Sequence, residues 1–196
     1  MTAGALARVI RGAADRRAAA AERCDLCGAP VPAEHRHLYD TEREELHCGC
    51  DSCVLLVAEG GAAGGRYRPV PERRLRLPPV DIAALGAPAG LAFFVRHRDG
   101  TVTGRYPSPA GATRWETDPD AWRAAVAGHP ALATLEPEVE ALLVNTTGDL
   151  SHHWLTPIDD CFRVVSVVRR EWRGLSGGGR VRPAVEEFFE QLTERP

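Results

Sequence analysis

The chain has 196 residues, 44% of them hydrophobic, and its 24 basic and 27 acidic residues give a formal net charge of −3. This length predicts one domain plus a small module, and the charge balance argues against a dedicated nucleic-acid binder. A chain of this size can build its own core, so its six cysteines are not needed as the disulfide staples of a small secreted domain.

The first residues do not resemble a targeting or membrane segment. Charged residues interrupt 1–21 before an apolar region can form, and no run of the chain approaches the ~20 apolar residues of a membrane span. We therefore expect a cytoplasmic protein whose thiols stay reduced. Residues 1–23 instead predict a short helix with a thin apolar stripe that includes Leu6, Val9 and Ile10.

Five of the six cysteines follow within residues 24–60. Four of them form two Cys-x-x-Cys pairs about twenty residues apart, a spacing that lets two tight turns present four thiolates to one ion, as in a zinc ribbon. The predicted metal ligands are Cys24, Cys27, Cys50 and Cys53.

Other residues of this segment are alternative ligands. Cys48 is the rival fourth or fifth ligand, although replacing Cys50 by Cys48 would give a less regular spacing. Three histidines could also coordinate, but a histidine beside a complete set of four thiolates is more often a surface or outer-shell residue. These histidines are His35, His37 and His47.

The pattern does not by itself identify the metal. We favour structural zinc, because closed four-cysteine sites are a common way to fold a small segment. A rubredoxin-like iron centre uses the same pair of turns and would make the protein an electron carrier. An iron–sulfur cluster is the third alternative, suggested by the triplet Cys48-x-Cys50-x-x-Cys53.

Between and after the cysteine pairs, Arg36–Tyr39 and Glu44–Cys48 predict a hairpin, and the glycine-rich residues 59–65 predict a loop. We take residues 61–79 as a linker. It contains a run of arginines, which beside a zinc ribbon could bind nucleic acid. Residues 1–80 hold 12 arginines against 11 acidic residues, however, so we favour a solvated loop or a surface that docks a partner. The arginines are Arg66, Arg68, Arg73, Arg74 and Arg76.

Residues 80–196 predict a small α+β domain with an antiparallel sheet and helices on one face of it. Leu91–Val95 and Thr101–Tyr106 form a hairpin whose Asp99-Gly100 dipeptide indicates a type I′ turn. Asp118 and Pro119 begin a helix. Residues 138–155 could form either two strands or a helix turn followed by a strand, and we favour strands at 142–144 and 153–155. Apolar periodicity predicts amphipathic C-terminal helices over 158–172 and 181–192.

No residue of this domain predicts catalysis. Cys161 lies near a helix start but on its apolar face, which favours a buried structural cysteine over a nucleophile. His152 and His153 are adjacent, so on a strand they point to opposite faces and cannot share one ion. The glycine-rich residues 174–179 lack the order of a phosphate-binding loop. We therefore expect a protein that is not an enzyme.

Several stretches along the whole chain resemble an uncharacterised bacterial family that is often encoded beside nickel–iron hydrogenase genes. The stretches are Cys-Asp-Leu-Cys-Gly-Ala-Pro at 24–30, His-Arg-His-Leu at 35–38, Gly-Leu-Ala-Phe-Phe at 90–94, Tyr-Pro-Ser-Pro-Ala-Gly-Ala at 106–112, Leu-Glu-Pro-Glu-Val-Glu-Ala-Leu-Leu-Val-Asn at 135–145, Pro-Ile-Asp-Asp-Cys at 157–161 and Trp-Arg-Gly-Leu-Ser-Gly-Gly at 172–178.

The resemblance implies an accessory role and no assigned activity. Hydrogenase gene clusters carry proteins that deliver metal, hold immature subunits or pass electrons. Our leading expectation is therefore a non-enzymatic zinc protein that binds a protein partner such as a hydrogenase subunit or maturation factor. The iron electron carrier and the zinc-ribbon nucleic-acid binder are the alternatives.

Overall fold

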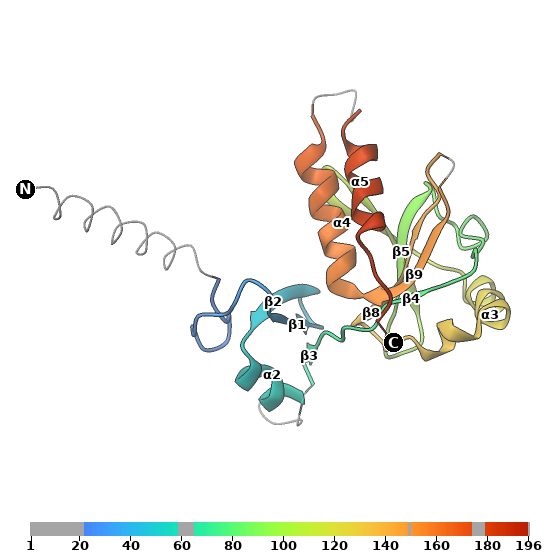
Figure 1. The fold of residues 1–196 in the computed structure, drawn as a ribbon. Helices are drawn as coiled ribbons and strands as arrows, with labels where there is room; N and C mark the ends of the chain where they lie inside the picture. Colours follow the sequence, from blue (N-terminus) through green and yellow to red (C-terminus); the bar gives the residue numbers. More distant parts are fainter. Residues whose placement is uncertain (1–21, 59–64, 149, 174–178, 196) are drawn as a thin grey trace, which may run out of the picture. The chain divides into compact units, whose positions relative to one another are not determined.

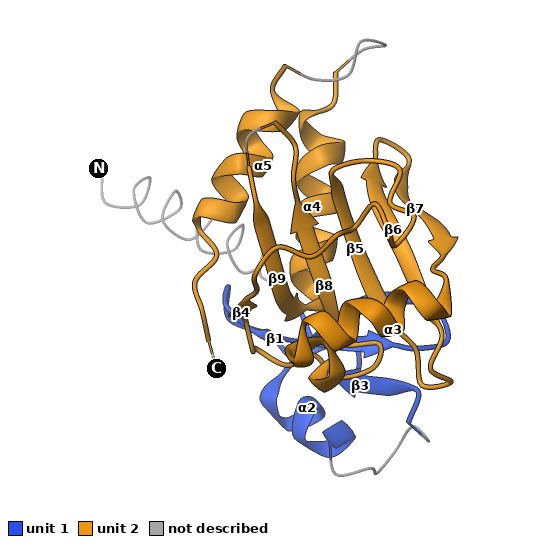
Figure 2. Cartoon of the chain, turned by 90° about the vertical axis from the view of Figure 1, so that its right-hand side faces the viewer, with its two compact units in different colours: residues 1–69 blue, residues 70–196 orange. Residues whose placement is uncertain are grey.

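The chain divides into two compact units, residues 1–69 and 70–196, which are coloured separately in Figure 2. The computed structural model describes residues 22–58, 65–148, 150–173 and 179–195. The predicted α+β fold with antiparallel sheets is confirmed (Figure 1).

The predicted boundaries of the N-terminal segments can be compared with the structure only in part. The division between the units falls inside residues 61–79, the predicted linker, which contributes a short strand to each unit. All but the last two residues of the helix predicted at 1–23, and nearly all of the loop at 59–65, lie outside the described residues.

Unit 1 contains a small antiparallel sheet with the strand order β2-β1-β3. The predicted hairpin is present as β1 (Arg36–Asp40) and β2 (Glu45–Gly49), and β3 (Tyr67–Pro69) pairs with the other edge of β1. Helix α2 (Asp51–Ala58) follows β2 after one residue. Among the described residues of unit 1 few large side chains are buried, so the core that they form is small.

A buried carboxylate holds the β1–β2 turn together. Asp40 is inaccessible to solvent, and its Oδ1 accepts hydrogen bonds from the backbone N–H groups of Glu42 and Arg43, at 3.0 and 3.1 Å. Its Oδ2 accepts two hydrogen bonds from the Arg66 guanidinium, at 3.0 and 2.5 Å. Asp40 thereby ties the hairpin turn to the residue that precedes β3.

Unit 2 contains a six-stranded antiparallel sheet with the order β4-β9-β8-β5-β6-β7. The predicted strands are present, whereas the short strand β4 and the edge strand β7 were not predicted. The strands are β4 (Leu75–Arg76), β5 (Leu91–Arg96), β6 (Val102–Ser108), β7 (Gly111–Glu116), β8 (Glu140–Asn145) and β9 (His152–Pro157).

The β5–β6 hairpin uses a different turn from the predicted type I′. That turn needs a positive φ at both central residues, but here only Gly100 has one, at 86°. The Gly100 N–H donates to the carbonyl of His97 at 3.0 Å, so the turn spans four residues and Gly100 ends it. The Asp99 carboxylate instead accepts hydrogen bonds from the backbone and hydroxyl of Thr101.

Helices cover both faces of this sheet, so the prediction of helices on one face is wrong. Helix α3 packs with the core that contains Phe94 and Leu142, while α4 and α5 contact each other and α4 contacts strands of the same sheet (Figures 1 and 2). Every residue of β8 is buried, as expected for a strand covered on both sides. The helical elements of unit 2 are α3 (Pro119–Gly128), the 3₁₀ turn η1 (Pro130–Thr134), α4 (Ile158–Glu171) and α5 (Val181–Glu190).

Candidate metal centre

The first Cys-x-x-Cys pair lies in a tight turn before β1. The N–H of Cys24 donates to the carbonyl of Ala29 and the N–H of Gly28 donates to the carbonyl of Cys24, both at 2.8 Å. Gly28 has a φ of 74°, a conformation that costs glycine little. Both sulfurs of the pair are therefore held on one short loop, with Cys24 buried and Cys27 exposed.

The second pair lies where β2 passes into α2. Cys50 precedes the helix and Cys53 lies in its first turn, and the N–H of Val54 donates to the carbonyl of Cys50 at 3.0 Å. Both sulfurs of this pair are therefore carried by the start of α2, where the partial positive charge of the helix N-terminus would stabilise thiolates bound to a metal.

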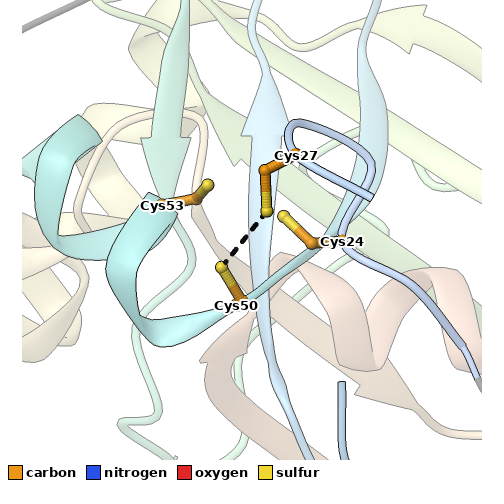
Figure 3. Close-up of side chains that lie close together, drawn as sticks. All are labelled: Cys24, Cys27, Cys50 and Cys53. Carbon is orange, nitrogen blue, oxygen red and sulfur yellow. Dashed lines mark hydrogen bonds between the residues drawn. The ribbon is translucent and has the colours of Figure 1, made fainter. Parts of the chain in front are cut away.

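The structure brings the four predicted ligands together. Their sulfur atoms all lie within 4.8 Å of one another, and Figure 3 shows the side chains meeting from the loop and the helix. The sulfurs of Cys27 and Cys50 are 3.7 Å apart, and no cysteine of the chain forms a disulfide. Four thiolates at about 2.3 Å from one ion would be separated by about 3.8 Å, so the observed spacing suits tetrahedral coordination.

The thiol pKa values of Cys24 and Cys53 are shifted in opposite directions. Burial raises the pKa of Cys24, but hydrogen bonds from the backbone N–H groups of Cys50, Cys27 and Leu26 outweigh it and lower the pKa to about 6. Burial and the three neighbouring cysteines raise the pKa of Cys53 to about 12. The lowered pKa of Cys24 favours its thiolate and the raised pKa of Cys53 opposes one, whereas a divalent cation bound here would favour thiolates at both.

The alternative ligands lie in a different place. Cys48 groups with His35 and His37, whose ligand atoms lie within 4.8 Å of one another, and is absent from the four-cysteine group. His47 lies elsewhere again, with its Nδ1 at 3.6 Å from a carboxylate oxygen of Asp25. The structure thus separates Cys48 from the four predicted ligands.

The arginines of 66–76 do not form a free basic patch. Arg66, Arg73 and Arg74 each make a two-point hydrogen bond to a buried carboxylate, on Asp40, Glu140 and Asp160 respectively. These guanidinium groups act inside the fold, so less positive charge remains for a nucleic-acid backbone than the sequence alone indicates.

The other residues considered for chemistry serve the fold of unit 2. Cys161 is fully buried, and burial followed by the charges of Asp160 and Asp159 raises the pKa of its thiol. His153 is buried and its Nδ1 accepts from the backbone N–H of Val80 at 3.2 Å, while His152 stacks on Phe189. Most of the glycine-rich residues 174–179 lie outside the described part of the chain.

Sequence reasoning missed one residue of unit 1 that positions a candidate ligand. Asp25, between the two cysteines of the first pair, accepts a hydrogen bond from the N–H of Cys48 through its carboxylate at 2.7 Å. Its own N–H donates to the carbonyl of Cys48 at 2.9 Å. The only sequence signal was its place beside Cys24, because the contact joins segments more than twenty residues apart.

Comparison with known proteins identifies a family but no activity. A family model described as "Family of unknown function (DUF5947)" matches residues 23–196. No curated protein and no solved structure matches the chain. Among the described residues, no helix has the length and apolar character needed to span a membrane.

Proposed function

The chain belongs to the DUF5947 family, and we propose that it is a non-enzymatic accessory protein in which Cys24, Cys27, Cys50 and Cys53 hold a structural zinc ion. One observation carries the proposal: two turns far apart in the sequence place four sulfurs within 4.8 Å of one another. Such a closed set of thiolates is typical of zinc that stabilises a fold.

A structural role suits the small size of unit 1. Its core is small, and units of this size commonly depend on a metal for stability. The ion would join the loop before β1 to the start of α2. Structural zinc sites of this kind contribute on the order of 10 kcal/mol to folding.

Metal analysis of the anaerobically purified chain tests the proposal. We expect a colourless protein that contains zinc. The Cys27→Ser variant should hold one zinc ion fewer, because it lacks one of the four thiolates; Cys27 is exposed, so the substitution removes no buried side chain. Cys161→Ser is the matched control and should keep the wild-type zinc content. A red protein containing iron would refute structural zinc and favour the electron-transfer alternative.

We further propose that unit 1 works through contacts with another protein. Three exposed leucines lie beside the cysteines in the sequence: Leu26 is 40% exposed, Leu55 57% and Leu56 53%. Leu55 and Leu56 are consecutive residues of α2, and large exposed apolar side chains that lie together are a common feature of protein-binding surfaces. The narrower proposal of a hydrogenase subunit or maturation factor depends on the family resemblance alone.

Co-purification with tagged hydrogenase components tests the partner. We expect capture by the wild-type chain and its loss in Leu55→Ser/Leu56→Ser, with the zinc content unchanged. The matched control is Val57→Ser on the same helix, whose half-buried side chain contributes less surface. If no hydrogenase component is captured by the wild-type chain, the hydrogenase assignment is wrong.

A further inference from the structure

We propose that His35, His37 and Cys48 form a second metal site, distinct from the four-cysteine site, which binds a divalent ion such as zinc with an open fourth position. Nitrogen and thiolate ligands of this kind suit zinc and neighbouring first-row metals. The three residues that would form it all lie outside the four-cysteine group.

The pairing of β1 with β2 builds the site. His35 and His37 are two residues apart in an extended segment, so their side chains lie on the same side of it. His37 is the register partner of Cys48 across the hairpin. The rings of His35 and His37 have centroids 4.8 Å apart, and one ligand atom from each of the three residues lies within 4.8 Å of the other two.

The hydrogen bonding of His35 points to a ligand. Its Nδ1 lies 2.9 Å from the carbonyl oxygen of Pro32, which can only accept, so Nδ1 carries the proton. The Glu22 carboxylate lies 3.5 Å from the same nitrogen. Metal-binding histidines almost always donate their second nitrogen to a carbonyl or carboxylate in this way, which directs the lone pair of the other nitrogen to the ion.

That other nitrogen, Nε2, has no hydrogen-bond partner although it is buried. The His35 side chain is only 5% exposed, and its Nε2 is shielded from solvent. A buried acceptor that has lost its water without gaining a hydrogen-bond partner is unfavourable. A cation held jointly with His37 and Cys48 would satisfy it, which simple packing of the three side chains does not.

Hydrogen bonds to Asp25 hold the backbone of Cys48 in place. Asp25 fixes its backbone by hydrogen bonds to both its N–H and its carbonyl. Two carboxylates lie beside the group, Asp25 at the Cys48 backbone and Glu22 at 3.5 Å from His35 Nδ1, and their negative charge would favour a cation there.

Three protein ligands distinguish this site from the first one. Structural zinc sites have four protein ligands, whereas sites with three leave a position for water or for a group brought by another molecule. The second site is therefore suited to an exchangeable ion, and the four-cysteine site to a permanent one.

Anaerobic titration of the purified, zinc-containing chain with cobalt(II) tests the proposal. We expect one added equivalent to bind with the visible bands of tetrahedral cobalt and a charge-transfer band of single-thiolate intensity. In Cys48→Ser that charge-transfer band should disappear. In His35→Gln the affinity for cobalt should fall by more than the roughly 10–100-fold that loss of an outer-shell partner costs.

His47→Gln is the matched control, because His47 lies on the neighbouring position of β2 and outside the group. It should bind cobalt as the wild type does. Retention of zinc by each variant shows that the four-cysteine site and its fold are intact. Failure of the wild-type chain to bind the extra cobalt, or an unchanged single-thiolate band in Cys48→Ser, would overturn the proposal.

Discussion

Replacing Asp40 by asparagine should selectively weaken unit 1. Its buried carboxylate accepts four hydrogen bonds, from two backbone N–H groups of the turn and from the Arg66 guanidinium. Asparagine keeps a similar shape but loses the charge, so Arg66 would be left without its buried partner.

The size of the effect follows from the pKa of Asp40. Hydrogen bonding from Arg66, opposed by burial and assisted by the N–H groups of Arg43 and Glu42, lowers it from 3.8 to about 2. This corresponds to about 2 kcal/mol of stabilisation. Because the folded pKa is the lower one, the stabilisation is complete above about pH 4 and is lost as the pH falls towards 2.

Amide hydrogen exchange at neutral pH measures this loss segment by segment. A change of about 2 kcal/mol should lower the protection of β1 and β2 in Asp40→Asn roughly thirty-fold, and leave β8 in unit 2 unchanged. Glu42→Gln is the matched control, because Glu42 is 68% exposed and contacts the same Arg66 at 3.4 Å. An exposed pair of this kind contributes less than about 1 kcal/mol. Equal losses in both variants would refute the reasoning.

Three further predictions concern unit 2. Gly104→Ala should destabilise it by about 1–3 kcal/mol in urea denaturation followed by tryptophan fluorescence, because a Cβ there would lie 2.3 Å from ring atoms of Trp115; an unchanged midpoint would contradict this. Cys161, fully buried and with a raised pKa, should resist iodoacetamide in the native protein and react only after denaturation, as mapped by peptide mass spectrometry; rapid native labelling would show that it is accessible. Asp160→Asn should lower the free energy of unfolding by about 3 kcal/mol in the same denaturation assay, because the Arg74 side chain is only 14% exposed and would keep an unpaired charge. A loss below about 1 kcal/mol would show that water solvates the Arg74 charge in place of Asp160.

Local signals in the sequence predicted most of the elements correctly. Asp118 followed by proline marks the start of α3, and its carboxylate indeed accepts the N–H groups of the first turn. The apolar spacing from Ile158 predicted α4. The edge strand β7 was missed because its side chains are mostly exposed or half-buried, without the alternation that marks a strand with one buried face.

Local signals could not predict ion pairs between residues far apart in the sequence. Arg73 and Glu140 are 67 residues apart and Arg74 and Asp160 are 86 apart, so nothing local distinguishes these buried pairs from a solvated basic run. Cover on both faces of the sheet was likewise unpredictable from single elements. The only sign of it in the sequence was the apolar run of β8, whose residues are all buried in the structure. A short apolar run does not by itself distinguish a strand buried on both faces from a helix.

Residue spacing was also insufficient to predict every contact within the candidate metal centre. The Cys-x-x-Cys spacing was sufficient to predict four sulfurs that meet, but not to decide where Cys48 belongs. Gly49 makes that distinction: it ends β2, and a Cβ at this position would lie 2.8 Å from Val54 Cγ2 in α2. The missing side chain lets the helix approach as the chain leaves the strand. Cys48 therefore stays with the hairpin and its histidines, whereas Cys50 joins the other three cysteines, so the two groups are separated by backbone packing that residue spacing alone does not express.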